Sequence, residues 1–295
     1  MNDPRRGVLN LFPRFIALRK RGYPRELASE LRVSEHGLFI WMYLAVQIAE
    51  NGFVSVDRHH WRTPYFTFDM WSPLWREHVA AGLAEEAPGG WRITDAGFGA
   101  IARVCAAART YLASLPVPTE QATRASRALS RIAGEIPRDA ERAQGAKRLA
   151  PDKQRATSWL VAIDQAVLEL WAYRDDCHIA AWSAAGYEGP AIDVLTQIWA
   201  GATDEDVVFA KLQQPAKVEA PKQTRGDVQQ IIKRLLDRGD VAVAGRRVAL
   251  TGQGRSIRDR IEVETDGPYF RIWKRVDDAA SLLDDLSRIL TSVKA

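Results

Sequence analysis

The chain of 295 residues exceeds the usual length of one domain, so two compact units are the default expectation. With 46% hydrophobic and 26% charged residues, its composition is typical of a folded globular protein and excludes an intrinsically disordered one. The net charge of +4 is mild, so it permits an anionic partner without requiring one.

The sequence contains no run of the roughly 20 uncharged apolar residues that a membrane helix needs. Its first 22 residues mix charges with apolar side chains and lack a signal-peptide core, so we expect a cytoplasmic protein. Cys105 and Cys177 could form at most one bridge and have no CxxC spacing. Neither a disulfide framework nor a zinc ribbon is therefore supported, and we expect two buried thiols.

The elements expected first along the chain are helices. Pro24 marks a helix start, and Ser34 can cap a long helix over residues 35–52, which is apolar nearly all round and is therefore a core element. A β-like run follows from Phe53 to Val56, then a polar loop and a helix over residues 70–86. After the Pro-Gly-Gly turn at residues 88–90, the chain reads WRITDAG and returns to a helix.

The middle and the end of the chain differ in charge. Residues 114–154 are polar, rich in arginine and broken by prolines, so we expect exposed connecting helices. From Lys217 to Arg260 there are 11 basic and 5 acidic residues, a local excess larger than the net charge of the chain. The expected final helix, residues 276–290, is acidic, and its leucines could pack internally or bind a partner, which would make the chain an interaction scaffold. These residues are Asp277, Asp278, Asp284 and Asp285, and Leu282, Leu283, Leu286 and Leu290.

The second half of the sequence repeats the order of the first half at a constant offset of 157 residues. In both halves an apolar helical stripe precedes a glycine, a strand, a tight turn, a second strand ending in Thr-x-x-Gly, and a helix. This order is that of a winged helix. The matched residues are Trp71 and Val228, Trp75 and Ile232, Val79 and Leu236, Gly82 and Gly239, Gly89-Gly90 and Arg246-Arg247, Trp91 and Val248, Ile93 and Leu250, Thr94 and Thr251, and Gly97 and Gly254.

The repeat predicts a mainly α fold with small β-hairpin wings, in which two winged-helix units in tandem are joined by long helices. The two units could face each other across a pseudo-twofold axis. We expect an N-terminal winged-helix-like unit over residues 1–115, a helical Arg-rich connector over 116–157, a long helix with a C-terminal winged-helix unit over 158–266, and an acidic terminal helix over 267–295.

From the long helix onward the sequence resembles the SalK-type helix-turn-helix family, which is usually described as MarR-like. The resemblance is good from about residue 159 to 266 and looser over 33–75, and Cys177 stands where the family has glycine. It implies a helix-turn-helix fold and says little about biochemical function. The matching residues are Arg174, Asp176, His178, Ala180, Ala181, Ala185, Gly186 and Gly189, and the runs at 224–226, 238–239, 250–254 and 261–266.

The helix expected over residues 225–238 is the best candidate for contact with DNA. Thr224 and Asp227 form a weak capping box at its start, and its apolar stripe leaves the polar residues on the opposite face. Glutamine can read base edges, and arginine or lysine can hold phosphates. The alternative is a solvated charged face. The candidate DNA-binding residues are Arg225, Gln229, Gln230, Lys233 and Arg234 on the helix and Arg246 and Arg247 at the wing tip.

The first half is a weaker candidate for contact with DNA. Its equivalent helix offers Arg76 but is accompanied by Glu77, Glu85 and Glu86, and its turn is Pro-Gly-Gly. We therefore assign DNA contact to the second half; if only that half contacts DNA, the first could serve packing, ligand capture or dimerisation.

A second candidate site lies near the end of the long helix that begins at about residue 159. Its apolar stripe runs into Arg174 and His178, which lie on one face because they are four residues apart. Charged groups in a buried stripe need partners, so a network with carboxylates that locks the helix is the favoured interpretation. The alternative is an effector pocket, also lined by Trp199. The candidate ligand-binding residues are Trp171, Arg174, Asp176, His178 and Trp182.

Neither a metal site nor a cofactor is predicted. His59 and His60 are adjacent and cannot share a helix face, and no known catalytic motif is present with supporting context, so nothing favours an enzyme. We predict a DNA-binding transcriptional regulator with duplex DNA as partner; a small-molecule effector and a homodimer stay open. The alternative is a small-molecule-binding protein or an unrecognised enzyme that uses a cleft around Asp176 and His178.

Overall fold

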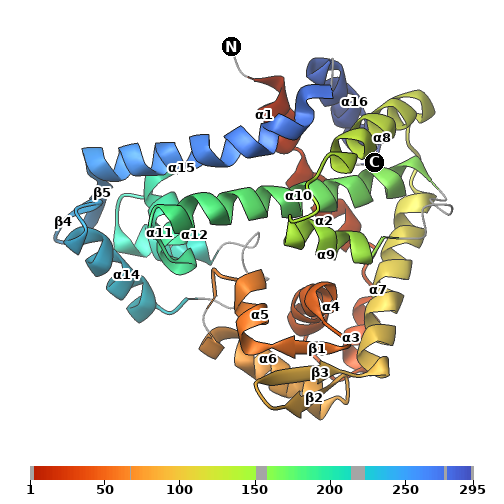
Figure 1. Cartoon of the computed structure of the whole chain (residues 1–295), viewed down its shortest axis with the longest axis horizontal. Helices are drawn as coiled ribbons and strands as arrows, with labels where there is room; N and C mark the ends of the chain where they lie inside the picture. Colours follow the sequence, from red (N-terminus) through yellow and green to blue (C-terminus); the bar gives the residue numbers. More distant parts are fainter. Residues whose placement is uncertain (1–2, 67, 151–157, 214–222, 276–277, 294–295) are drawn as a thin grey trace. The chain divides into compact units, whose positions relative to one another are not determined.

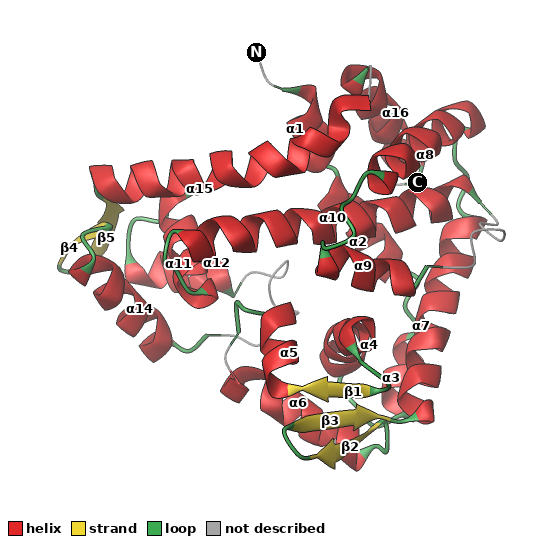
Figure 2. Cartoon of the chain, in the orientation of Figure 1, coloured by secondary structure: helices red, strands yellow, loops and turns green. Residues whose placement is uncertain are grey.

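A computed structural model describes residues 3–66, 68–150, 158–213, 223–275 and 278–293 (Figure 1). Lys217 and Asp277 lie outside these ranges. Within them the chain is mainly helical and has one three-stranded and one two-stranded antiparallel sheet (Figure 2). None of the described helices is both long enough and apolar enough to cross a membrane.

The chain forms two compact units, and each combines segments that are far apart in the sequence. The helical unit consists of Met1–Leu31, Phe98–Cys177 and Gly267–Ala295, and the mixed unit consists of Arg32–Gly97 and His178–Asp266. The helices that lie wholly or partly in the helical unit are α1 (Pro4–Leu9), α2 (Phe12–Lys20), α3 (Arg25–Glu30), α7 (Asp95–Ser114), α8 (Thr119–Gly134), α9 (Glu141–Arg148), α10 (Trp159–Ala184), α15 (Gly252–Arg271), η3 (Ile272–Arg275) and α16 (Ala279–Ser292).

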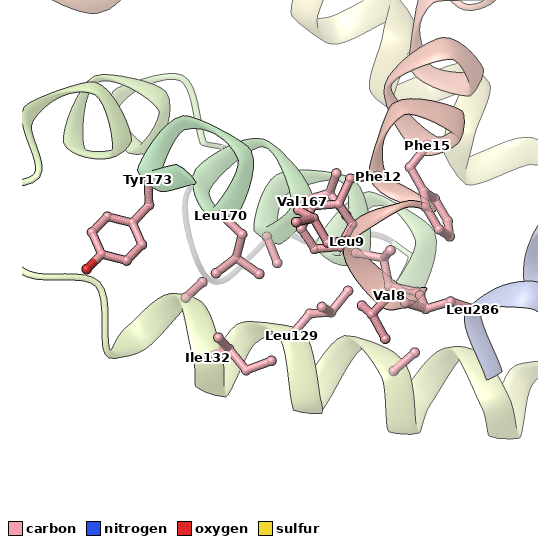
Figure 3. Packing of buried hydrophobic residues seen from close by; sticks show 14 of the residues in the cluster. Val8, Leu9, Phe12, Phe15, Leu129, Ile132, Val167, Leu170, Tyr173 and Leu286 are labelled. Carbon is pink, nitrogen blue, oxygen red and sulfur yellow. The ribbon is translucent and has the colours of Figure 1, made fainter. Parts of the chain in front are cut away.

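The core of the helical unit contains side chains from both ends and the middle of the chain. Figure 3 shows residues from α1, α2, α8, α10 and α16 in one buried cluster. Leu282, Leu286 and Leu290 of α16 are buried there, so the apolar face of the terminal helix packs internally. Burial of this kind stabilises a protein by roughly 1.5–3 kcal/mol for each large aliphatic side chain.

The expectation of exposed connecting helices between the two halves is wrong for α8. Ala122, Ala125, Leu129 and Ile132 recur at intervals of three and four residues and are buried in the core of the helical unit. Arginines occupy the other face of the helix and give the segment its polar composition. The overall composition therefore concealed an amphipathic helix.

Residues 32–97, the first segment of the mixed unit, fold around an aromatic core. The elements are η1 (Gly37–Met42), α4 (Tyr43–Ile48), β1 (Phe53–Ser55), α5 (Val56–Arg62), α6 (Phe68–Ala80), β2 (Ala84–Ala87), β3 (Gly90–Ile93) and the start of α7. The strands pair in the order β1-β3-β2. As predicted, Ser34 caps the helical run that begins at Glu35 and continues into η1, because its Oγ accepts a hydrogen bond from the Gly37 N–H at 3.0 Å.

Three expectations for this segment are wrong. The helix expected through residue 52 ends at Ile48, because Ala49 is extended with a ψ of 131°. The polar loop after Val56 is helix α5, because Ser55 Oγ accepts from the Arg58 N–H at 3.0 Å and so caps a new helix. The helix expected through residue 86 ends at Ala80, since Gly82 adopts a positive φ of 71°. The following Ala84–Ala87 then pairs with β3 as a strand.

Residues 178–266, the second segment of the mixed unit, contain the end of α10, α11 (Gly189–Trp199), α12 (Glu205–Leu212), α14 (Arg225–Asp237), β4 (Val241–Ala244), β5 (Arg247–Leu250) and most of α15. The capping box at Thr224 and Asp227 is confirmed, with both reciprocal hydrogen bonds present. Strands β4 and β5 form a hairpin, and Asp204, just before α12, bridges to Arg247 of β5.

The bounds of four successive elements recur 157 residues apart: α6 and α14, β2 and β4, β3 and β5, and α7 and α15. The Thr-x-x-Gly motif has the same structural function in both places. The hydroxyls of Thr94 and Thr251 donate to the carbonyls of Gly82 and Gly239, at 2.8 and 2.7 Å, and each caps the next helix. Gly97 and Gly254 pack against a backbone carbonyl so closely that a Cβ atom would clash with it.

Candidate nucleic-acid interface

Helix α14 has one buried and one exposed face. Val228, Ile231, Ile232 and Leu235 are buried in the core of the second segment. Leu236, which the repeat placed on the apolar stripe, is instead 43% exposed. The seven residues proposed to contact DNA are all exposed: Arg225, Gln229, Gln230, Lys233, Arg234, Arg246 and Arg247.

The β4–β5 hairpin presents two of these arginines at its end. Ala244 pairs with Arg247, so Gly245 and Arg246 form a two-residue turn, and Gly245 has the positive φ of 61° that such turns favour. Arg246 therefore lies in the turn, and Arg247 is the first residue of β5.

The charge of this surface is partly neutralised by helix α12. The carboxylate of Asp206 accepts hydrogen bonds from both Arg225 and Arg246, and Glu205 accepts one from Gln229. The bond from Arg225 is the main reason why the pKa of Asp206 lies below its ordinary value. Asp206 lies before the basic stretch that supplied the sequence-predicted candidates. The signal available for it was the acidic start of α12, where Asp204 caps the helix and Glu205 and Asp206 follow.

The remaining cations differ in their partners. The Arg225 guanidinium also lies 4.5 Å from the centre of the Phe209 ring, and Arg234 pairs with Glu188 at 3.6 Å. Lys233 and Arg247 form no ion pair with any residue in the described part of the chain. Lys233 and Arg247 are thus the candidates whose charge is not offset by an adjacent carboxylate.

The sequence profile of a helix-turn-helix family matches residues 80–295, a range that includes α12, α14 and the hairpin. The chain belongs to this helix-turn-helix family. Membership suggests a DNA-binding regulator. Searches of curated proteins and of solved structures each gave no match.

The first segment of this helix-turn-helix protein presents a different surface at the corresponding elements. Arg76 of α6 is exposed, but the carboxylate of the neighbouring Glu77 accepts a hydrogen bond from the Ser34 N–H. Strand β2 exposes Glu85 and Glu86, and its hairpin turn contains no cation. This surface lacks the cationic hairpin turn that the second segment has.

The proposed ligand-binding residues of the helix-turn-helix protein divide between the two units. Asp176, in the helical unit, accepts hydrogen bonds from Arg142 Nη1 at 2.9 Å and from the Ala143 N–H at 3.3 Å. Burial raises the pKa of Asp176, and the Arg142 guanidinium acts in the opposite direction. His178, in the mixed unit, has Nδ1 3.0 Å from Thr265 Oγ1. Arg142 comes from the Arg-rich connector, so spacing along α10 could not reveal it.

Three of the four other residues considered with this cluster lie in packed or half-buried positions. Arg174 is half-buried; Trp171 packs against the core of the helical unit, and Trp182 is buried in the core of the second segment. Trp199, by contrast, is 37% exposed, and its Nε1 donates to Asp259 at 2.8 Å. Ligand binding at this cluster stays a prediction.

The paired histidines of α5 have separate environments. His59 is buried, with its ring centre 4.1 Å from that of Trp71 and 5.2 Å from that of Trp41, whereas His60 is exposed. Burial is the main cause that lowers the pKa of His59 from 6.5 to about 3. Within the described residues, no group of three or more histidine, cysteine or acidic side chains is arranged to hold a metal ion.

Proposed function

We propose that this helix-turn-helix protein is a winged-helix transcriptional regulator whose second segment binds duplex DNA through α14 and the β4–β5 hairpin. One observation carries the proposal: the exposed face of α14 and the adjacent hairpin turn present glutamines and cations together, within the range that the family profile matches. The major groove of duplex DNA admits an α-helix, and there glutamine reads base edges, while arginine and lysine hold phosphates.

We further propose that the mixed unit contains two winged-helix copies in tandem, of the SalK type that the sequence resembles. The recurrence of element bounds and of the Thr-x-x-Gly contacts supports this interpretation. The elements follow the same order in both segments. A strand or an isolated β-bridge comes first, then two helices, a β-hairpin and a further helix. A cytoplasmic location, the four-part organisation, a homodimer and an effector belong to the same hypothesis.

The decisive experiment is a selection of genomic DNA fragments by the purified full-length protein. Arg246→Ala plus Arg247→Ala, and separately Lys233→Ala plus Arg234→Ala, should reduce enrichment strongly. Arg127→Ala plus Arg131→Ala is the matched control, since it removes the same charge from exposed positions on α8. Enrichment by the two α14 and hairpin variants equal to that of the control variant would refute the assigned surface. Absence of enrichment by the unaltered protein at moderate salt would refute DNA binding.

A further inference from the structure

Asp206 occupies an unusual position in the proposed interface, because one carboxylate joins two of its cations. We propose that Asp206 is an internal competitor for DNA phosphate, which weakens binding to duplexes of any sequence and so increases the contribution of base contacts to selection. The inference rests on the proposed function and adds a specificity-determining residue to it.

The contact joins three elements of the second segment. Asp206 lies in the first turn of α12, Arg225 is the first residue of α14, and Arg246 lies in the hairpin turn. Backbone hydrogen bonds hold the start of α12 against the hairpin: the Glu205 N–H donates to the Arg246 carbonyl at 3.3 Å, and the Val248 N–H donates to the Thr203 carbonyl at 2.9 Å. The start of α12, and with it Asp206, is therefore held beside the hairpin turn that carries Arg246.

A phosphate and a carboxylate are alternative acceptors for a guanidinium group, because both offer paired oxygens to its N–H donors. The side chains of Arg225 and Arg246 are 58% and 74% exposed, and an exposed ion pair is weak enough for a polyanion to displace it. After displacement, the Asp206 charge would remain near the DNA backbone and repel it.

This competition weakens the part of the binding affinity that does not depend on the DNA sequence. Phosphate contacts supply nearly all non-specific affinity and its dependence on salt. Gln230, which lies on the exposed face of α14, forms no hydrogen bond with Asp206, so its amide is available to read a base edge. Asp206 therefore weakens binding to DNA of random sequence more than it weakens the contacts with correct bases.

Asp57 provides a matched control in the first segment. Each aspartate lies two residues after the residue that caps its helix: Ser55 caps α5, and Asp204 caps α12 by accepting from the Val207 N–H at 2.9 Å. Asp57 is exposed and forms no ion pair with any described residue. Asp57→Asn thus makes the same change in net charge without releasing an arginine.

The test measures the affinity of full-length wild type, Asp206→Asn and Asp57→Asn for a short fluorescent duplex of random sequence, between about 0.05 and 0.2 M salt. We expect Asp206→Asn to bind about tenfold more tightly at about 0.1 M salt, with a salt slope steeper by about one to two, whereas Asp57→Asn matches the wild type. Adding Arg225→Ala and Arg246→Ala to Asp206→Asn should remove the gain.

The outcomes separate the two proposals. Wild-type binding with equal or weaker binding by Asp206→Asn would overturn the inference and leave the proposed function in place. An equal gain from Asp57→Asn would also overturn it, since net charge alone would then explain the effect. If none of the three proteins binds at the lowest salt concentration, the proposed function fails and the inference falls with it.

Discussion

The two segments of the mixed unit match in the bounds of four successive elements, 157 residues apart, but differ in what they expose and what they bury. The first has an aromatic core of tryptophans around His59, and the second has an aliphatic core around Val228 and Ile231. The first exposes glutamates on its hairpin, whereas the second exposes arginine at the turn. Glycines and threonines thus fix the backbone in both segments, while the other positions are free to give each one a different surface.

The largest expected effect is on stability and comes from substitutions in the two different cores. Trp71→Ala should destabilise the protein by about 3–5 kcal/mol, because Trp71 is fully buried among other rings. Val228→Ala at the matching position of the second segment should cost less, about 1.5–3 kcal/mol. Urea denaturation of both variants measures this difference. Equal losses would show that the two cores depend on these positions to the same extent.

Substituting the glycine of the Thr-x-x-Gly motif should lower the stability of the protein to a similar extent in both segments. Gly97→Ala and Gly254→Ala should each destabilise the protein by about 1–3 kcal/mol, because the new methyl group would clash with the carbonyl of Leu83 or Asp240. Gly99 lies in α7, two residues after Gly97, and has open space around it. Gly99→Ala should therefore stabilise the protein by about 0.5–1 kcal/mol. Thermal unfolding of the three variants is the measurement, and a tolerated change at only one of the two motif glycines would argue against their equivalence.

The aromatic core should make stability depend on pH. Because burial lowers the pKa of His59 from 6.5 to about 3, the unfolded chain binds a proton more readily than the folded chain. The contribution of His59 to the free energy of unfolding is therefore fully present above pH 6.5. It falls as the pH drops towards 3, by up to about 1.4 kcal/mol per pH unit. His59→Phe should flatten that slope, while His60→Gln should not, in denaturation midpoints measured across this range. An unchanged slope in His59→Phe would assign the dependence to other groups.

Removing a cation at matching exposed positions should weaken DNA binding in the second segment only. Lys233→Ala should weaken DNA binding about tenfold at ~0.1 M salt and reduce the salt slope by about one. Arg76 lies 157 residues before Lys233 in the first segment, and Arg76→Ala should leave both quantities unchanged. Fluorescence anisotropy with one duplex compares the two variants. Equal losses would mean that both segments contact DNA.

Local signals predicted the elements that local interactions determine. Thr224 with Asp227 marked the start of α14, and the positive φ of Gly245 and the hydroxyl contacts of Thr251 explain why the hairpin and the following helix could be located from the sequence. Helix α5 was missed because it is short and has no apolar stripe to distinguish it from a polar loop.

Contacts between distant residues could not be predicted in this way. Asp206 meets arginines 19 and 40 residues away, and Arg142 meets Asp176 across 34 residues. Neither pairing leaves a periodic pattern, because each depends on how separate helices pack. The assignment of exposed cations was therefore accessible from the sequence, but the carboxylates that offset them were not.

The helical unit has a practical consequence for dissecting this protein. Leu160, Ile163 and Val167 of α10 share a buried cluster with Val8 and Phe12 of the N-terminal helices. A fragment starting at residue 158 would retain the whole proposed DNA-reading surface yet expose this apolar stripe to water, inviting self-association. Truncation studies should therefore keep the N-terminal helices, and point substitutions are the safer way to probe each surface.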